Sequence, residues 1–217
     1  GDMQTFLESN EMMKQMFSNS NVSIEASFTS TIMIVLVSLV GILPIVIVNK
    51  LFSEESKLRL SQIYPTKVTR SNVYWNTIGL AFLSSILGVL VATLSLGMIG
   101  INAMEGHGEL EITNFLAAGY NFLPAILFFI SLAALAIGWA PKLGKLAYAY
   151  LGYNFAINYF GNTLDLPEWF SKTAILNWLP QMPKDNFDVI TFITLTIIGI
   201  IFIVLGYIGY RKRDLIG

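Results

Sequence analysis

Long runs of apolar residues, separated by short polar stretches, dominate this chain of 217 residues. An α-helix rises 1.5 Å per residue, so about 20 apolar residues cross a bilayer core of ~30 Å. Five runs reach or approach that length, and they occupy residues 28–50, 74–103, 112–137, 145–161 and 189–210. The pattern predicts an all-α integral membrane protein whose five transmembrane helices form a single transmembrane domain over residues 1–217.

Individual spans differ in detail. Pro44 lies inside the first span and predicts a kink near its end, because proline removes a helix hydrogen bond. The second span opens with Tyr74 and Trp75, which we expect at the membrane–water interface, where aromatic side chains are enriched. The fourth span, residues 145–161, is the least apolar of the five.

Two segments outside the spans are amphipathic or broken. Residues 1–26 include apolar positions at helical spacing, and we expect this segment to lie on the outer membrane surface. Residues 162–188 are rich in apolar side chains, but prolines divide them into pieces too short to cross a bilayer. We expect an outer re-entrant or interfacial loop there, which either anchors at the interface or covers an outward cavity as a lid. The residues that characterise this loop are Leu166, Pro167, Trp169 and Trp178.

The distribution of lysine and arginine between the loops predicts the orientation of the chain. Alternate loops place ten of the 13 basic residues on one side, and three basic with eleven of the 14 acidic residues on the other. Basic residues in short loops stay on the cytoplasmic face. We therefore expect a multi-pass protein of a bacterial cytoplasmic membrane, with the N-terminus outside and the C-terminus in the cytoplasm. An outside start also leads us to expect a further span before Gly1, so that the chain is a fragment of a longer protein.

The most charged stretch, residues 53–64, predicts a short amphipathic helix on the cytoplasmic side. Ser53 is a favourable N-cap, and Glu54 and Glu55 fill the first turn. Tyr64 followed by Pro65 ends the pattern. One interpretation is a helix whose basic side chains meet anionic lipid. The other is a docking surface for a cytoplasmic partner. Docking better explains why two acids begin the predicted helix and why Tyr64 and Pro65 end it.

Composition excludes several classes of function. Only 12% of the residues are charged, against ~25% in soluble domains. The chain has no cysteine, which excludes disulfides and thiolate chemistry, and His107 is its single histidine, in an expected solvated turn. The sequence contains no phosphate-loop, dinucleotide-binding, zinc-protease or serine-hydrolase motif. We therefore expect no enzyme activity, no metal site and no cofactor in this chain.

The fourth span carries a polar stripe. Tyr150, Asn154 and Asn158 are spaced by four residues and share one face of a helix. Amides in hydrocarbon are costly unless they are hydrogen-bonded, so this face looks into protein or water. The stripe is either a hydrogen-bonded contact between helices or part of a translocation path. Since no ionisable residue lies deep in any span, an ion-coupled pump is disfavoured.

Taken in order, these parts resemble an ATP-binding-cassette (ABC) exporter permease of the ABC-2 type. The likeness is to the C-terminal half of the roughly twelve-span permeases known as exporters of polyketide antibiotics. Residues 51–70 are similar to that family's acid-pair coupling helix, residues 137–143 to its short inner turn, residues 166–169 with Pro180 and Pro183 to its outer loop, and residues 211–215 to its basic ending.

The resemblance implies a permease subunit of an ATP-driven exporter that moves an amphipathic drug, antibiotic, peptide or lipid out of the cell, with a role in antibiotic resistance. ATP and Mg would be bound by a separate ABC ATPase subunit. The implied partners are that subunit, the remaining permease half or a second copy, membrane lipid and the substrate, with no nucleic acid. The implied ATPase contact comprises Glu54, Glu55, Lys57, Leu58, Arg59, Tyr64, Pro65 and Arg70. The alternative is a non-transporting anchor or sensor subunit that recruits a cytoplasmic partner through the same segment.

Overall fold

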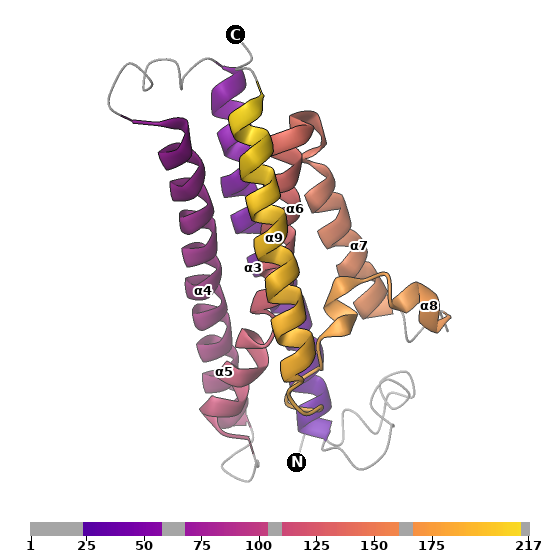
Figure 1. Ribbon diagram of the computed structural model, residues 1–217. Coiled ribbons are helices and arrows are strands. Elements are labelled where there is room, and N and C mark those ends of the chain that lie inside the picture. The colour runs from indigo at the N-terminus through magenta and orange to yellow at the C-terminus, as the bar shows by residue number, and fades with distance from the viewer. Residues whose placement is uncertain (1–23, 58–67, 104–109, 161–166, 214–217) are drawn as a thin grey trace.

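The computed structural model describes residues 24–57, 68–103, 110–160 and 167–213 (Figure 1). Within these ranges every regular element is a helix. The elements are α3 (Ile24–Ser56), α4 (Arg70–Ala103), α5 (Ile112–Tyr120), α6 (Leu123–Trp139), η2 (Pro141–Leu143), α7 (Leu146–Phe160), α8 (Glu168–Ser171), η3 (Ile175–Trp178) and α9 (Val189–Lys212). Four predictions fall outside the described residues, namely the amphipathic segment before Ile24, the part of the 53–64 helix from Leu58 onward, His107 and Leu166.

Four helical segments among the described residues are long and apolar enough to cross a membrane, as expected of a multi-pass membrane protein. They run over Ala26–Glu55, Arg70–Asn102, Ile112–Trp139 and Val189–Lys212. The expected fourth span corresponds to α7, which has 15 residues and is therefore about 22 Å long. This is less than the ~30 Å thickness of a bilayer core. A count of five full-length spans is therefore not confirmed.

The first span continues past its expected end. The sequence pattern predicted a new helix with Ser53 as its N-cap, but α3 is unbroken from Ile24 to Ser56. The predicted helix start at Ser53 is therefore wrong. Glu54 and Glu55 lie in the last turn of α3, next to the negative end of the helix dipole. The capping preference of serine was overridden because cations at the start of α4 and just after α9 bind this turn and stabilise it, as described below.

The third span is divided into two helices. Asn121 and Phe122 separate α5 from α6 and interrupt the single helix that was predicted over residues 112–137. Pro124 explains the break, because proline has no N–H for the carbonyl four residues earlier and its ring clashes with that carbonyl. The Asn121 side chain, which lies at this break between α5 and α6, donates from Nδ2 to the Pro180 carbonyl oxygen over 2.7 Å.

Helix α6 lies at the centre of the bundle. It packs along α9 and also against α3 and α4, while α7 packs against α3 and diverges from α9 toward the end that carries α8 (Figure 1). A Cβ atom added to Gly206 of α9 would stand 2.6 Å from the Ala134 carbonyl oxygen of α6, so only glycine allows this approach. Small residues at helix contacts are typical of membrane proteins, because helices inside lipid associate through close packing rather than the hydrophobic effect.

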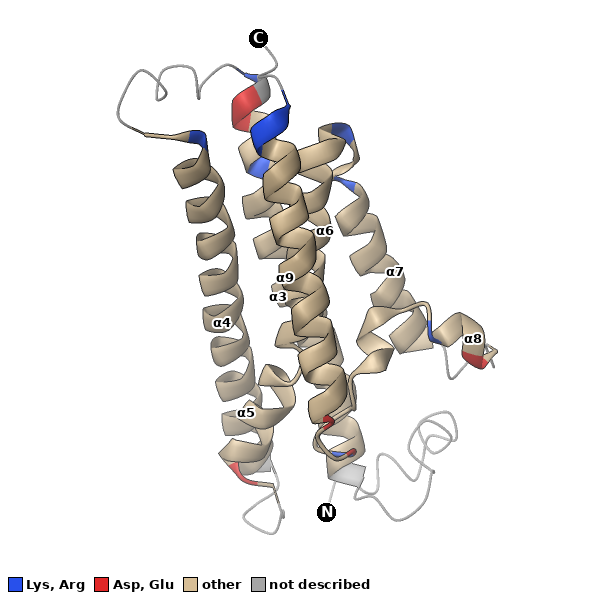
Figure 2. Cartoon of the chain, viewed as in Figure 1, with Lys and Arg blue, Asp and Glu red and all other residues tan. Residues whose placement is uncertain are grey.

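Charged residues gather at the two ends of the bundle (Figure 2). We call one end the basic end; the helix bounds place there Lys50, Lys57, Arg70, Lys142, Lys145, Arg211, Lys212 and Arg213, with Glu54 and Glu55. The opposite end carries Glu111, Glu168, Asp185 and Asp188, with Lys172 and Lys184. The described basic residues are thus separated between the two ends as the loop pattern predicted.

Candidate functional site

Glu55 lies at the basic end, where three helices meet. It belongs to the last turn of α3 and is only 3% exposed. Arg213, which follows α9 directly, donates from Nη2 to Glu55 Oε2. Arg70, the first residue of α4, places its Nη2 3.9 Å from Glu55 Oε1. One buried carboxylate therefore joins the ends of α3, α4 and α9. We call Glu55, Arg70 and Arg213 the basic-end cluster.

Arg70 also binds the last turn of α9. Its Nη1 donates to the Arg213 carbonyl oxygen over 3.1 Å, and its Nη2 donates to the Tyr210 carbonyl oxygen over 2.8 Å. The last carbonyl groups of a helix have no partner within the helix and carry the negative end of its dipole, so a guanidinium is favourable there. The Arg70 guanidinium also lies 5.0 Å from the centroid of the Tyr210 ring, within the range of a cation–π contact.

A layer of tyrosines lies next to the basic-end cluster, between α4 and α9. Tyr74 is 1% exposed and donates its hydroxyl to the Ile203 carbonyl oxygen over 2.7 Å. Its ring centroid lies 5.3 Å from that of Tyr210, and the hydroxyls of Ser71 and Tyr207 are 2.7 Å apart. Tyr74 is therefore covered by α9, whereas Trp75, the other aromatic residue expected at the membrane interface, is 44% exposed.

The basic-end cluster compensates an unfavourable placement of acids. A carboxylate at the C-terminal end of a helix meets the negative end of the dipole, and burial adds a desolvation cost. Two guanidinium groups offset both effects at Glu55. Because Glu55 precedes residues 57–69 and Arg70 follows them, the ion pair also fixes the two ends of the connection between α3 and α4.

The four described residues among those expected to contact an ATPase fall into two groups. Glu55 and Arg70 face each other inside the basic end, whereas Glu54 is partly exposed and Lys57 is exposed. The remaining four, Leu58, Arg59, Tyr64 and Pro65, lie outside the described residues. Sequence reasoning missed Arg213 as the partner of Glu55, because the basic run at the end of the chain was interpreted as a topology signal and as part of the family resemblance, and neither interpretation pairs it with an acid.

At the other end of the bundle, the polar stripe of α7 binds the loop over residues 167–188. Tyr150 donates its hydroxyl to the Thr173 carbonyl oxygen over 2.8 Å. Asn154 is fully buried; its Oδ1 accepts from the Leu176 N–H over 3.0 Å, and its Nδ2 donates to the Tyr150 carbonyl oxygen over 2.8 Å. These two side chains hold η3 and the residues before it against α7.

Asn158, the third residue of the stripe, does not bind the loop through its hydrogen bonds. Its Nδ2 donates to the Asn154 carbonyl oxygen over 3.1 Å. Its Oδ1 is buried and has no hydrogen-bond partner among the described residues. The stripe is thus divided between a helix–loop contact and a side chain that lines a small cavity.

Other helices hold the far part of the same loop. Ser30 of α3 donates to the Gln181 carbonyl oxygen over 2.9 Å and accepts from the Lys184 N–H over 3.3 Å. Of the loop residues selected from the sequence, Pro167 is the N-cap of α8 and Trp169 is 69% exposed. The third, Trp178, is exposed and donates its indole N–H to the Lys172 carbonyl oxygen over 2.8 Å.

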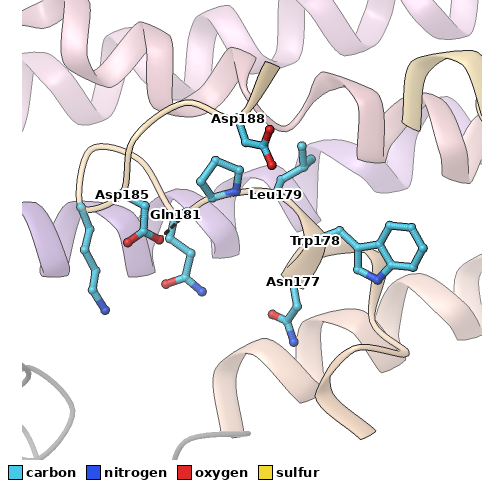
Figure 3. Close-up of a pocket in the computed structure, with 8 residues that line it drawn as sticks. Asn177, Trp178, Leu179, Gln181, Asp185 and Asp188 are labelled. Carbon is cyan, nitrogen blue, oxygen red and sulfur yellow. Dashed lines mark hydrogen bonds between the residues drawn. The ribbon is translucent and has the colours of Figure 1, made fainter. Parts of the chain in front are cut away.

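An open hollow of about 380 Å³ lies on this loop (Figure 3). Its lining comprises Asn177, Trp178, Leu179, Pro180, Gln181, Lys184, Asp185 and Asp188. Asp185 accepts from the Gln181 N–H over 3.0 Å, while the Trp178 indole points away from both acids. Asp188 caps α9, and hydrogen bonds from the Thr191 hydroxyl and N–H hold the pKa of Asp188 below its ordinary value. Both carboxylates therefore serve the local fold of the loop.

Comparison with known proteins identifies the family of the chain. A search of curated proteins finds no match. A family model described as the C-terminal domain of the multidrug efflux system permease Rv1217c matches residues 1–211. A permease domain is a unit of membrane transport, which indicates a transport subunit rather than an enzyme and agrees with the four apolar spans. The chain belongs to the family of the C-terminal domain of the multidrug efflux system permease Rv1217c.

Proposed function

We propose that this chain is the permease part of an ATP-driven ABC exporter of the ABC-2 type, which moves amphipathic drugs or antibiotics out of the cell. The efflux permease family supports the transport role. ATP hydrolysis belongs to a separate subunit in this proposal, because the sequence contains no phosphate-loop motif. The remaining permease half or a second copy of the chain completes the transport path.

The basic-end cluster is the observation that carries the ATP-driven part of the proposal. Glu55 and Arg70 bring together the two ends of the connection over residues 57–69, and Arg213 ties the same point to α9. A partner that moves this connection therefore acts on α3, α4 and α9 at once. In the proposal Glu55 and Arg70 transmit the movement, whereas Glu54, Lys57 and the residues that follow Lys57 contact the ATPase.

The proposed orientation places the basic end in the cytoplasm. Basic residues in short loops favour that side of the membrane. The N-terminal end of α3 and the loop over residues 167–188 then lie outside. Helix α7 becomes a short fifth span, and a span shorter than the bilayer core is accommodated by local thinning of the bilayer.

Charge reversal in the connection tests the ATPase contact. Lys57→Glu combined with Arg59→Glu should replace attraction by repulsion at close charge pairs and so weaken assembly with the ATPase subunit. Lys142→Glu, an exposed residue of η2 at the same end, is the matched control. The full permease is purified from membranes together with a coexpressed ATPase subunit, and copurification and ATP hydrolysis are measured.

We expect the double variant to lose both copurification and stimulated ATP hydrolysis, while the Lys142→Glu control keeps them. Equal copurification and equal ATP hydrolysis in all three proteins would refute the ATPase contact. Copurification without any ATP-dependent export would instead support the anchor or sensor subunit.

A further inference from the structure

A small cavity lies between α3 and α7, next to the loop over residues 167–188. Its volume is about 30 Å³. A space of about 10–15 Å³ admits one water molecule, so this cavity admits a group of one or two non-hydrogen atoms. Its walls are Thr31, Ile34 and Val35 of α3, Phe155, Asn158 and Tyr159 of α7, and Gln181 of the loop.

Asn158 supplies a hydrogen-bond acceptor to this cavity. Its Nδ2 is committed to the Asn154 carbonyl oxygen, whereas its Oδ1 is buried without a partner in the part of the chain that the structure describes. Thr31 donates its hydroxyl hydrogen to the Ser27 carbonyl oxygen over 3.0 Å, which leaves its oxygen as a second acceptor. A buried acceptor is unfavourable unless a donor reaches it. The cavity therefore favours a group that brings a hydrogen-bond donor.

The lining of the cavity favours a neutral group as the hydrogen-bond donor that occupies it. None of the lining side chains is ionisable near neutral pH, so an ammonium group would be buried without a counter-charge, at a large desolvation cost. Phe155 and Tyr159 stack with their ring centroids 5.8 Å apart, and Tyr159 is 44% exposed. The half-buried Phe155 and the exposed Tyr159 together offer an apolar surface next to the cavity, on which the body of a ligand can lie.

We propose that this cavity is a subsite for the hydroxyl group of a neutral amphipathic substrate. The hydroxyl of the substrate donates to Asn158 Oδ1, and the apolar body of the substrate packs on the rings of Phe155 and Tyr159 on the surface of α7. As a substrate subsite it rests on the efflux function proposed above, and it adds a substrate class to that function. The binding itself does not depend on an ATPase.

Binding of a matched pair of probes tests the subsite. The probes are 2-naphthylethanol and its methyl ether, which share an apolar body but differ in the hydroxyl hydrogen. Binding to the full permease in phosphatidylcholine nanodiscs is measured against empty nanodiscs, so that partition into lipid is subtracted. One hydrogen bond corresponds to a preference of about three- to tenfold for the alcohol. Asn158→Leu should abolish this preference, whereas Asn72→Leu, an exposed position at the start of α4, should keep it.

A second variant leaves the acceptor in place. Val35→Ile adds one methylene group to the cavity wall and should weaken binding of the alcohol even though Asn158 is unchanged. Equal binding of alcohol and ether to the wild-type protein, or a preference that survives Asn158→Leu, would overturn the proposal and leave the cavity as a site for a structural water only. If the protein prefers the alcohol but does not copurify with an ATPase subunit, the proposed ATP-driven exporter is refuted and the hydroxyl subsite stands.

Discussion

Glu55→Gln removes one negative charge from the basic-end cluster with almost no change of side-chain shape. Arg70 Nη2 stands 3.9 Å from the carboxylate, and at an effective dielectric constant of about 20 two unit charges at this separation attract by about 4 kcal/mol. Arg213 is in direct contact with the carboxylate and contributes at least as much. Desolvation of the carboxylate, whose side chain is 2% exposed, offsets part of this attraction.

Loss of one partner from a buried ion pair costs about 3–5 kcal/mol in comparable proteins. The side chains of Arg70 and Arg213 keep exposures of 26% and 15%, so water screens part of the repulsion that Glu55→Gln leaves between them. We therefore expect a loss of about 3 kcal/mol, at the lower end of that range.

Unfolding of the purified permease in mixed micelles of increasing SDS content measures this loss. Lys145→Gln is the control, because Lys145 is exposed at the same end and its loss should change the free energy of unfolding by no more than about 0.5 kcal/mol. Glu55→Gln combined with Arg213→Gln should cost less than the sum of the two single variants, since the two side chains are in contact. A loss at Glu55→Gln no larger than that of Lys145→Gln, or strict additivity in the double variant, would refute the ion-pair argument.

Further predictions concern the bundle contacts and the opposite end. Asn154→Ala should cost about 1–3 kcal/mol, because it leaves the buried N–H of η3 without its acceptor; faster hydrogen exchange confined to residues 171–179 would show it, and unchanged exchange would contradict it. Gly206→Leu should destabilise the protein by about 1–3 kcal/mol or more in the same SDS assay, since α6 leaves no room for a side chain. The lowered pKa of Asp188 means that its capping contribution is present at neutral pH and is lost as the pH falls through that pKa, so exchange protection of the first turn of α9 should fall on acidification in the wild type but not in Asp188→Asn. Single cysteines at Lys142 and Asp185, in a chain without native cysteine, should be protected and labelled respectively by an impermeant thiol reagent on intact cells; the reverse pattern would invert the proposed orientation.

Span positions followed from the sequence because the length of an apolar run is a local property. The helices α4 and α9 begin and end within a few residues of the expected spans. The break between α5 and α6 could also have been predicted from the sequence, because Pro124 lies inside the third apolar run. Its effect was missed because the run was assessed by hydrophobicity alone.

The partners within the site could not be predicted in the same way. Glu55 and Arg70 were both selected from one charged stretch, but as contacts for an external partner. The sequence offers no rule that pairs Glu55 with a residue 158 positions later, as the structure does with Arg213. The four-residue spacing of Tyr150, Asn154 and Asn158 correctly predicts a shared helix face. Spacing within one helix does not say that a loop covers two of these side chains and a cavity adjoins the third.

The separation of Glu55 and Arg213 along the chain has a consequence for biogenesis. Glu55 leaves the ribosome 158 residues before Arg213. During most of synthesis Arg70 is therefore the one guanidinium of the cluster that is already made. The charge at the end of α3 is fully balanced only when α9 has entered the membrane. A chain whose last helix fails to insert keeps an incompletely compensated acid at the membrane border, and this exposes the defect to the proteases that survey newly made membrane proteins.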